Sequence, residues 1–342
     1  MNNLSLEQVA PKPPPLLEVV NLRTHFNTPR GIARAVDGIS FSLERGRMLG
    51  IVGESGSGKS VLSRSIIDIL PRDGSVKYSG KVIFEGRDLS GLSSSEMRDM
   101  RGREIAMVFQ DPMSSLNPVM KIGSQLTEVL TRRRGYSKRS ARVRVVELLN
   151  AVGIPDPERQ LRNYPMHLSG GMRQRIAIAI ALAGDPKLLI ADEPTTALDV
   201  TIQGQILDLL QQLQRQRNMA IILITHDLGI VAEYADEVAV MYAGQFVERC
   251  ETGKLLKRPR MPYTEALIKS VPVLSAPPHT RLYSIPGLPP NLLMVPKGCR
   301  FHERCDYAQH DCRVSMPNLV ADYESDHYFA CWHPLGDGES RT

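Results

Sequence analysis

The stretch that decides the fold is Gly53-Glu54-Ser55-Gly56-Ser57-Gly58-Lys59-Ser60, which fits the pattern G-x-x-x-x-G-K-[ST]. It follows the apolar pair Ile51-Val52, and the residues from Val61 to Leu70 are periodic enough for a helix. Glycines between a strand and a helix let backbone N–H groups converge on phosphate oxygens. The predicted phosphate-binding residues are Gly53, Ser55, Gly56, Ser57, Gly58, Lys59, Ser60 and Val61.

Two side chains of this loop have separate predicted roles. Lys59 supplies a point charge for the β- and γ-phosphates of a nucleotide, and the Ser60 hydroxyl can ligate Mg²⁺. A glycine-rich turn with an incidental Lys-Ser pair is the alternative. The strand before the loop and the helix after it argue against that alternative.

A second signal is the run Leu188-Leu-Ile-Ala-Asp192-Glu193. Asp192 ends a buried strand, where it can hold Mg²⁺ through water. Glu193 follows at once and is placed to polarise an attacking water. Alone, such a carboxylate could be only a helix cap or a turn residue, but beside a phosphate loop we expect it to serve hydrolysis.

Strands and helices alternate through the body of the chain. Short apolar runs at 17–21, 48–52, 187–191 and 220–225 predict strands, and the last two are apolar enough to be buried on both faces. Residues 202–216 carry apolar side chains at helical spacing. The pattern predicts an α/β fold with a mostly parallel sheet. Residues 111–165 are richer in charge and predict a helical insert, with one helix over 140–152.

Composition excludes several classes of protein. The 342 residues suffice for about two domains. With 23% charged and 42% hydrophobic residues, the chain is globular rather than disordered. No run approaches about 18 apolar residues, so we expect no membrane-spanning helix. Met1 to Ala10 lacks the features of a secretory signal, and the five Cys then suggest a reducing compartment.

A further stretch, Leu168-Ser169-Gly170-Gly171-Met172-Arg173-Gln174, resembles the signature sequence of ABC-transporter ATPases. The other sequence elements of that family are present in order. Gln110 resembles the Q-loop residue, Ala197-Leu198-Asp199 the D-loop, His226 the switch histidine and Phe26 the adenine-stacking aromatic. The resemblance covers roughly residues 16–260. It implies an ABC-type nucleotide-binding domain with an antiparallel β subdomain and a helical subdomain at about 111–180.

The resemblance also implies roles for these residues. In this family two nucleotide domains pack head to tail, with ATP between the phosphate loop of one and the signature of the other. Ser169, Gly170, Gly171, Gln174 and Asp199 would then serve the shared interface and the partner's nucleotide. Glu193 is the expected general base, His226 the contact to the γ-phosphate, and Gln110 a contact to Mg²⁺ and water. Each of these residues could instead have a purely structural role. A lone His that follows a buried strand, such as His226, is more often structural than functional.

The tail narrows the resemblance to the dipeptide/oligopeptide permease ATPases. The similar segments are Pro259-Arg-Met-Pro-Tyr-Thr264, Ile285-Pro-Gly-Leu-Pro-Pro290 and Gly298-Cys-Arg-Phe301. We expect a boundary near residue 260, a C-terminal extension over 261–342 and a disordered leader over 1–15. The prolines after residue 271 predict irregular chain that buries little apolar surface.

Four cysteines of the tail suggest a metal centre. Cys299, Cys305 and Cys312 fit the spacing C-x5-C-x6-C, and Cys331 lies beyond them. The resemblance implies a four-iron–four-sulfur (4Fe-4S) cluster on these four thiolates, with a structural role and no link to phosphoryl transfer. Zinc and unligated thiols remain alternatives, although no C-x-x-C pair is present. His302, His310, His327 and His333 could substitute as ligands. Cys250 lies outside the spacing.

These signals predict the ATP-hydrolysing subunit of a membrane importer for di- and oligopeptides or similar solutes, with ATP and Mg²⁺ as ligands. The expected partners are a second, homologous ATPase subunit, two permease subunits and, indirectly, an extracytoplasmic solute-binding protein. The subunit would lie at the cytoplasmic face of the inner membrane. A soluble ABC ATPase acting on nucleic acid or ribosomes is the alternative, and a regulator without turnover is a third.

The basic stretch Arg132-Arg133-Arg134 with Lys138, Arg139, Arg142 and Arg144 bears on the nucleic-acid alternative. No aromatic stacking platform accompanies it, so we expect a solvated helix face rather than a nucleic-acid site. About 110 residues separate Lys59 from Ser169, which leaves no room for the long coiled coils of chromosome-type members.

Overall fold

The computed structural model describes residues 14–196, 198–272, 283–322 and 325–336. The predicted leader at 1–15 therefore lies almost wholly outside the described residues. Within them the helices are α1 (Lys59–Ile66), α2 (Ser94–Met100), α3 (Ile122–Arg134), α4 (Lys138–Ala151), α5 (Pro157–Gln160), α6 (Gly170–Leu182), α7 (Val200–Arg217), α8 (Leu228–Tyr234), α9 (Thr252–Lys257), α10 (Pro262–Ser270) and α11 (His310–Val314). No helix in these ranges has the length and apolar character needed to cross a bilayer.

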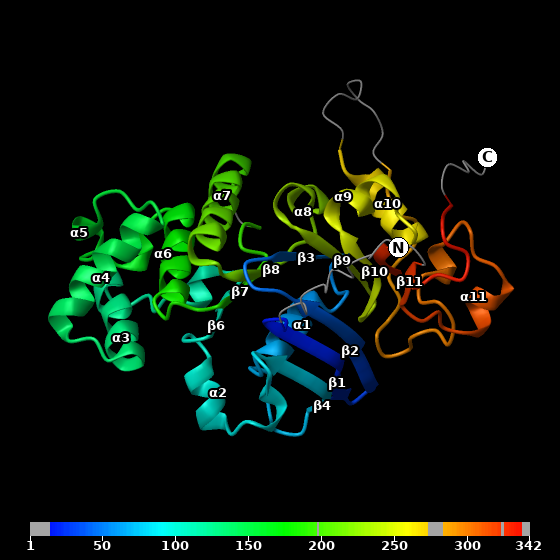
Figure 1. Cartoon of the computed structure of the whole chain (residues 1–342), viewed down its shortest axis with the longest axis horizontal. Helices are drawn as coiled ribbons and strands as arrows, with labels where there is room; N and C mark the ends of the chain where they lie inside the picture. Colours follow the sequence, from blue (N-terminus) through cyan, green and yellow to red (C-terminus); the bar gives the residue numbers. More distant parts are fainter. Residues whose placement is uncertain (1–13, 197, 273–282, 323–324, 337–342) are drawn as a thin grey trace, which may run out of the picture.

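In the described chain, a mixed sheet with strand order β11-β12-β10-β9-β3-β8-β7-β6 runs through the middle of the molecule (Figure 1). Its members are β3 (Met48–Val52), β6 (Ile105–Val108), β7 (Leu188–Asp192), β8 (Ala220–Ile224), β9 (Glu237–Tyr242), β10 (Gln245–Glu251), β11 (Val320–Asp322) and β12 (Ser325–Phe329). The strands from β9 to β6 are parallel, and β10, β12 and β11 continue the sheet antiparallel. The predicted parallel α/β core is confirmed.

Both faces of the parallel strands are covered, which explains their uninterrupted apolar runs. Every residue of β3, β7 and β8 is buried. Leu189 and Ala191 pack with α3, α4, α6 and α7 on one face. Leu188 and Ile190 pack on the other face with α1 and a second sheet. That sheet is antiparallel, in the order β2-β1-β4-β5, and consists of β1 (Leu17–Thr28), β2 (Gly31–Leu43), β4 (Val76–Phe84) and β5 (Arg87–Asp88).

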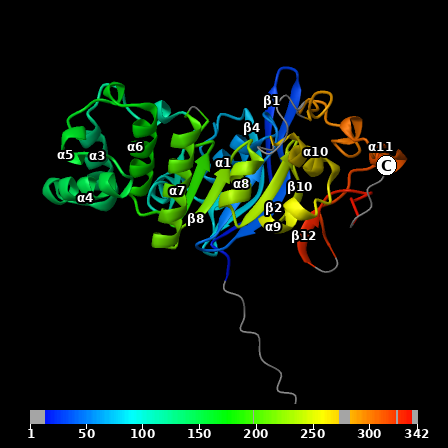
Figure 2. The ribbon, with the colours of Figure 1, turned by 90° about the horizontal axis from the view of Figure 1, so that it is seen from above.

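Helices α3 to α6 form the predicted helical subdomain at one end of the molecule, opposite the C-terminal extension (Figures 1 and 2). The helix expected at 140–152 is α4, which begins two residues earlier because Ser137 caps it by accepting a hydrogen bond from Ser140 N. Its buried side chains, including Val145 and Leu148, pack with Leu126 of α3 and Ile176 of α6.

The C-terminal extension shares a buried apolar cluster with β9 and β10, contrary to the expectation of little buried apolar surface. Tyr263 of α10 and Phe301 are 0% and 2% exposed. Their rings pack on Tyr242 of β9, with centroids 4.5 Å and 5.3 Å from the Tyr242 centroid. A few large aromatic side chains thus bury apolar surface in a region whose prolines predicted little of it. Residues 283–298 form no helix or strand, as predicted.

Glu248 of β10 anchors this extension to the main sheet. Its carboxylate is completely buried and accepts hydrogen bonds from Arg260 N at 2.6 Å and Met261 N at 3.0 Å, at the start of α10. It also lies 2.7 Å from Nε2 of His327 on β12. This buried carboxyl group therefore joins β10 to the start of α10 and to β12. The sequence boundary expected near residue 260 falls between α9 and α10.

Candidate functional site

The predicted phosphate loop joins β3 to α1, as the sequence indicated. Gly58 is the residue before α1 and has a φ of 105°. A Cβ at this position would lie 2.1 Å from the carbonyl oxygen of Ala35, so only glycine fits. The loop is therefore held close to β2, with its N–H groups at the N-terminus of α1.

Lys59 lies inside the concave face of this loop. Its Nζ donates to Gly53 O at 2.7 Å and to Glu54 O at 2.9 Å, and the residue is 5% exposed. Burial lowers the pKa of Lys59, and the nearby carboxylates of Glu193, Asp192 and Glu54 oppose that shift. An ammonium in such a site interacts strongly with an anionic ligand because little water screens it.

Ser60 and Asp192, the residues predicted to hold Mg²⁺, lie side by side. Ser60 Oγ donates to Asp192 Oδ1 at 2.9 Å, and Asp192 is 1% exposed at the end of β7. Burial raises the pKa of Asp192, while the Ser60 hydrogen bond and Arg64 lower it. A hydroxyl and a carboxylate side by side, both within reach of the phosphate loop, are the oxygen ligands that Mg²⁺ takes. The donor set fits the ion.

The three predicted catalytic residues meet beside this loop. Glu193, Gln110 and His226 follow the C-terminal ends of β7, β6 and β8, three neighbouring strands of the sheet. Gln110 Nε2 donates to Glu193 Oε2 at 3.0 Å, and His226 Nδ1 lies 3.5 Å from Glu193 Oε1. Parallel strands gather such residues at one edge, and this edge holds the predicted site.

The backbone at Glu193 is strained. Its φ is 47°, which is unfavourable for a residue with a side chain, and Glu193 N donates to Ile224 O at 2.9 Å. Thr196 Oγ1 donates to Glu193 Oε2 at 2.9 Å. Sequence reasoning missed Thr196. Only its spacing, three residues after Glu193, could have indicated it.

A cavity lies between these groups. It is lined by Ala35, Ser55, Gly56, Gly58, Lys59, Ser60, Val61, Gln110, Glu193, His226 and Leu292. Leu292 comes from the C-terminal extension, and its carbonyl accepts from Arg34 N at 3.0 Å. Phe26 does not line the cavity. It is half-buried on β1 opposite Ala33, two residues before Ala35, and its adenine contact stays a prediction.

The signature residues lie elsewhere. Ser169 caps α6 by accepting from Met172 N at 3.3 Å, and Ser169 and Gly170 are exposed. They do not line the cavity at Lys59. Gln174 is only 1% exposed and its Nε2 has no hydrogen-bond partner, so the structure does not present it at the surface with Ser169.

Asp199 caps α7 through Ile202 N at 3.0 Å. Leu198 is packed against the helical core, and Ala197 of the predicted D-loop lies outside the described residues.

The four tail cysteines line one small pocket, together with Met261, Pro262, His302, Tyr307, Ala308, Trp332 and His333. We call it the thiol pocket. Cys299 N donates to Cys312 O at 2.8 Å, and this bond joins the two chain segments that carry these cysteines. Burial raises the pKa of Cys305 to about 11 and that of Cys331 to about 12. These thiols stay protonated near neutral pH unless a cation compensates their charge. Cys250 lies outside the pocket.

The thiol spacing bears on the kind of metal. A single tetrahedral Zn²⁺ would draw its thiolates to about 3.8 Å from one another. Among the described residues, the ligand atoms of Asp311, Cys312 and His333 lie within 4.8 Å of one another, and no three of the thiols do so. His333 Nε2 is 2.9 Å from both Asp311 carboxylate oxygens.

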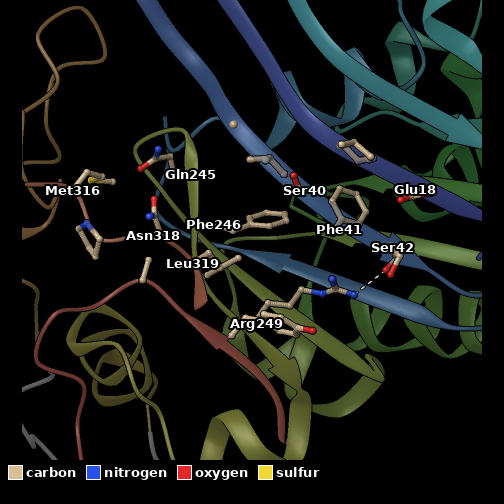
Figure 3. A pocket seen from close by; sticks show the side chains of 17 residues that line it. Glu18, Ser40, Phe41, Ser42, Gln245, Phe246, Arg249, Met316, Asn318 and Leu319 are labelled. Carbon is tan, nitrogen blue, oxygen red and sulfur yellow. Dashed lines mark hydrogen bonds between the residues drawn. The ribbon is translucent and has the colours of Figure 1, made fainter. Parts of the chain in front are cut away.

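A separate groove lies between β1–β2 and the C-terminal extension (Figure 3). Arg249 crosses it and donates to Ser42 O at 2.8 Å. None of the residues predicted for phosphate binding or hydrolysis lines this groove.

Comparison with known proteins gives matches over both parts of the chain. Residues 36–196 match the family model "ABC transporter", and residues 247–312 match "Oligopeptide/dipeptide transporter, C-terminal region". The oligopeptide transport ATP-binding protein OppD of Bacillus subtilis is 50% identical, over 93% of this chain and 89% of its own length. The dipeptide transport ATP-binding protein DppD of Escherichia coli is 49% identical, over 96% and 99%.

Solved structures agree with this. A dimeric post-hydrolysis state of the ATP-binding cassette MJ0796, bound to ADP and phosphate, is 26% identical with a TM-score of 0.61, covering 69% of this chain and 98% of that one. CbiO1 of Clostridium perfringens, part of an ABC transporter complex, is 30% identical with a TM-score of 0.60, covering 70% and 90%.

Proposed function

Since the chain belongs to the ABC transporter family and carries the oligopeptide/dipeptide transporter C-terminal region, we propose that it is the ATP-hydrolysing subunit of a membrane importer for di- and oligopeptides. The observation that carries the proposal is the position of Glu193 beside the phosphate loop, in contact with Gln110, Thr196 and His226. Relatives named for peptide transport match nearly the whole chain, including the extension.

The residues of the site divide the work of phosphoryl transfer. Lys59 and the loop N–H groups hold the phosphates, and Ser60 with Asp192 would hold Mg²⁺, which would neutralise charge on the phosphates. Glu193 accepts a proton from the attacking water, and Gln110 fixes its carboxylate at 3.0 Å. His226 Nδ1 lies 3.5 Å from Oε1 of Glu193, and His226 lines the same cavity, where it can donate to the γ-phosphate.

Hydrolysis takes place at an interface between two such subunits. Ser169 and Gly170 are exposed at the N-terminus of α6 and away from Lys59, which supports their use on the nucleotide of a partner. A homologous second ATPase subunit, two transmembrane permease subunits and an extracytoplasmic binding protein complete the importer. The chain lies at the cytoplasmic face of the membrane.

The runner-up, a soluble ABC ATPase acting on nucleic acid or ribosomes, has no observation in its favour. The basic side chains of the helical subdomain are partly paired on their own helices, with Arg132 2.9 Å from Glu128 and Arg144 2.8 Å from Glu147. The match of residues 247–312 to the peptide-transporter region also opposes it.

Peptide uptake in cells tests this function. Cells that lack the chain should take up labelled di- and oligopeptides much more slowly than the parent, while uptake of free amino acids continues. The wild-type chain should restore peptide uptake, and Glu193→Gln should not. Full peptide uptake without the chain, in cells with no other peptide importer, contradicts the proposal.

For the thiol pocket we propose a 4Fe-4S cluster held by Cys299, Cys305, Cys312 and Cys331. Four thiols around one pocket support a cluster that the four thiolates would hold. A zinc ion at Asp311, Cys312 and His333 is the rival. A cluster on the four thiolates would cross-link the extension and contribute to the free energy of its folding.

Removing one ligand tests the cluster. Anaerobically purified wild-type protein should be brown and contain iron and acid-labile sulfide. Cys305→Ser should lose the colour and lower the melting temperature of the protein. Cys250→Ser is the matched control, because this thiol is buried in the same apolar cluster but outside the pocket, and it should keep the full iron content. Stoichiometric zinc without sulfide in the wild type contradicts the cluster.

A further inference from the structure

The C-terminal extension reaches the phosphate loop, whereas the sequence suggested no link between them. Arg304 Nη1 donates to Glu54 Oε2 at 2.6 Å, and Nη2 donates to Glu54 Oε1 at 2.8 Å. Two parallel bonds between a guanidinium and a carboxylate fix both groups in one plane, and they are stronger than neutral hydrogen bonds. The Arg304 side chain is 4% exposed and that of Glu54 25%, so water reaches the carboxylate but hardly the guanidinium.

Arg304 is itself held rigidly. Its Nε donates to Pro286 O at 2.8 Å, and Nη1 also donates to the Tyr242 hydroxyl at 3.1 Å. The guanidinium lies 5.8 Å and 5.9 Å from the ring centroids of Tyr242 and Phe301. A side chain with this many partners cannot follow the movements of Glu54. It therefore restricts the loop rather than merely accompanying it.

Glu54 transmits the restriction to the phosphate site. Its backbone N–H donates to the buried Tyr263 hydroxyl at 3.0 Å, and its carbonyl accepts from Lys59 Nζ at 2.9 Å. One residue of the loop is thus held through its side chain and its N–H by the extension, while its carbonyl positions the phosphate-binding lysine.

We propose that Arg304 is a positioning residue of the nucleotide site, which keeps the phosphate loop in its binding conformation by holding Glu54. Arg304 does not line the nucleotide cavity, so it acts through the loop. Loss of the clamp frees the Glu54 side chain and leaves the Tyr263 hydroxyl as the remaining contact from the extension. The phosphates must then order the loop, which lowers their affinity. The affinity for both ADP and ATP should fall, because both carry the β-phosphate that Lys59 would contact.

Nucleotide binding to the purified full-length chain tests this. Arg304→Ala should raise the dissociation constants of Mg-ATP and Mg-ADP by at least about tenfold, and Arg304→Lys, which cannot make two parallel bonds, should rescue only part of the loss. Glu54→Gln changes the other partner of the ion pair. Its side chain is 25% exposed, and the variant should also bind both nucleotides more weakly. In the Arg304→Ala/Glu54→Gln double variant the losses should not add.

Arg300→Ala is the matched control. Arg300 lies in the same segment, and its side chain is 5% exposed and paired with Asp37 of β2 rather than with the phosphate loop. It should lower the melting temperature as Arg304→Ala does, yet leave the nucleotide dissociation constants within about twofold. Equal weakening by Arg300→Ala and Arg304→Ala would show that docking of the extension, and not the clamp, supports the loop. Unchanged affinity in Arg304→Ala and in Glu54→Gln would equally overturn the proposal.

Discussion

Glu193→Gln is expected to lower ATP hydrolysis at least about a hundredfold while ATP binding persists. The amide keeps the size of the side chain and can still contact Gln110 and Thr196, which lie 3.0 Å and 2.9 Å from Oε2. It cannot take the proton of the attacking water. Lys59, Ser60 and Asp192 remain in place, so the phosphates and Mg²⁺ are still held. The variant should therefore accumulate as an ATP-loaded dimer.

The measurement is steady-state phosphate release, with ATP affinity determined on the same preparation. Glu251→Gln makes the same change at an exposed residue, the last of β10 and the one before α9, and should leave the rate unaltered. A Glu193→Gln rate close to the wild-type rate would show that another group activates the water.

Ser169→Arg is expected to abolish hydrolysis at the site shared with the partner subunit. An exposed hydroxyl at the N-terminus of α6 would be replaced by a long cation where a nucleotide phosphate should meet the Ser169 hydroxyl and the Gly170 N–H. The phosphate loop lies elsewhere in the chain. ATP affinity of the isolated subunit should therefore stay close to that of the wild type.

Loss of the helix cap must be separated from loss of the interface, since removing a Ser cap costs about 1 kcal/mol. Ser137→Arg is the matched control because Ser137 caps α4 in the same way and is exposed. It should reduce stability to a similar extent and leave ATP turnover intact. Equal loss of ATP affinity in the isolated Ser169→Arg subunit contradicts the head-to-tail arrangement.

The parallel strands could be predicted from local patterns, whereas the roles of Gln110 and His226 were predicted from the order of the sequence elements that resemble the ABC-transporter family. Strands buried on two faces must be apolar throughout, which identified β7 and β8. The structure brings Glu193 near His226 because parallel strands have their C-terminal ends at one edge of the sheet. Helix ends were predicted less well, as at α4, where the cap at Ser137 decides the start.

The contacts of the extension could not be predicted in the same way. Arg304 and Glu54 are 250 positions apart, and no periodicity connects two residues that meet only after the chain has folded. The burial of Tyr263 and Phe301 against Tyr242 was hidden by the surrounding prolines, which indicate irregular backbone but say nothing of side-chain packing. The left-handed backbone at Glu193 could not be predicted either, because residue type does not indicate it.

Peptide uptake by proteoliposomes tests the central claim most directly. The vesicles would contain the chain, its partner ATPase and the two permeases. The binding protein and labelled peptide would be on the side of the membrane from which the permeases take up peptide, and Mg-ATP on the side of the ATPase. Uptake should depend on ATP, and should fall to background when Glu193→Gln replaces the wild-type chain. Glu251→Gln should support uptake at the wild-type rate. Undiminished ATP-driven uptake with Glu193→Gln, or ATP turnover that moves no peptide, would contradict the account.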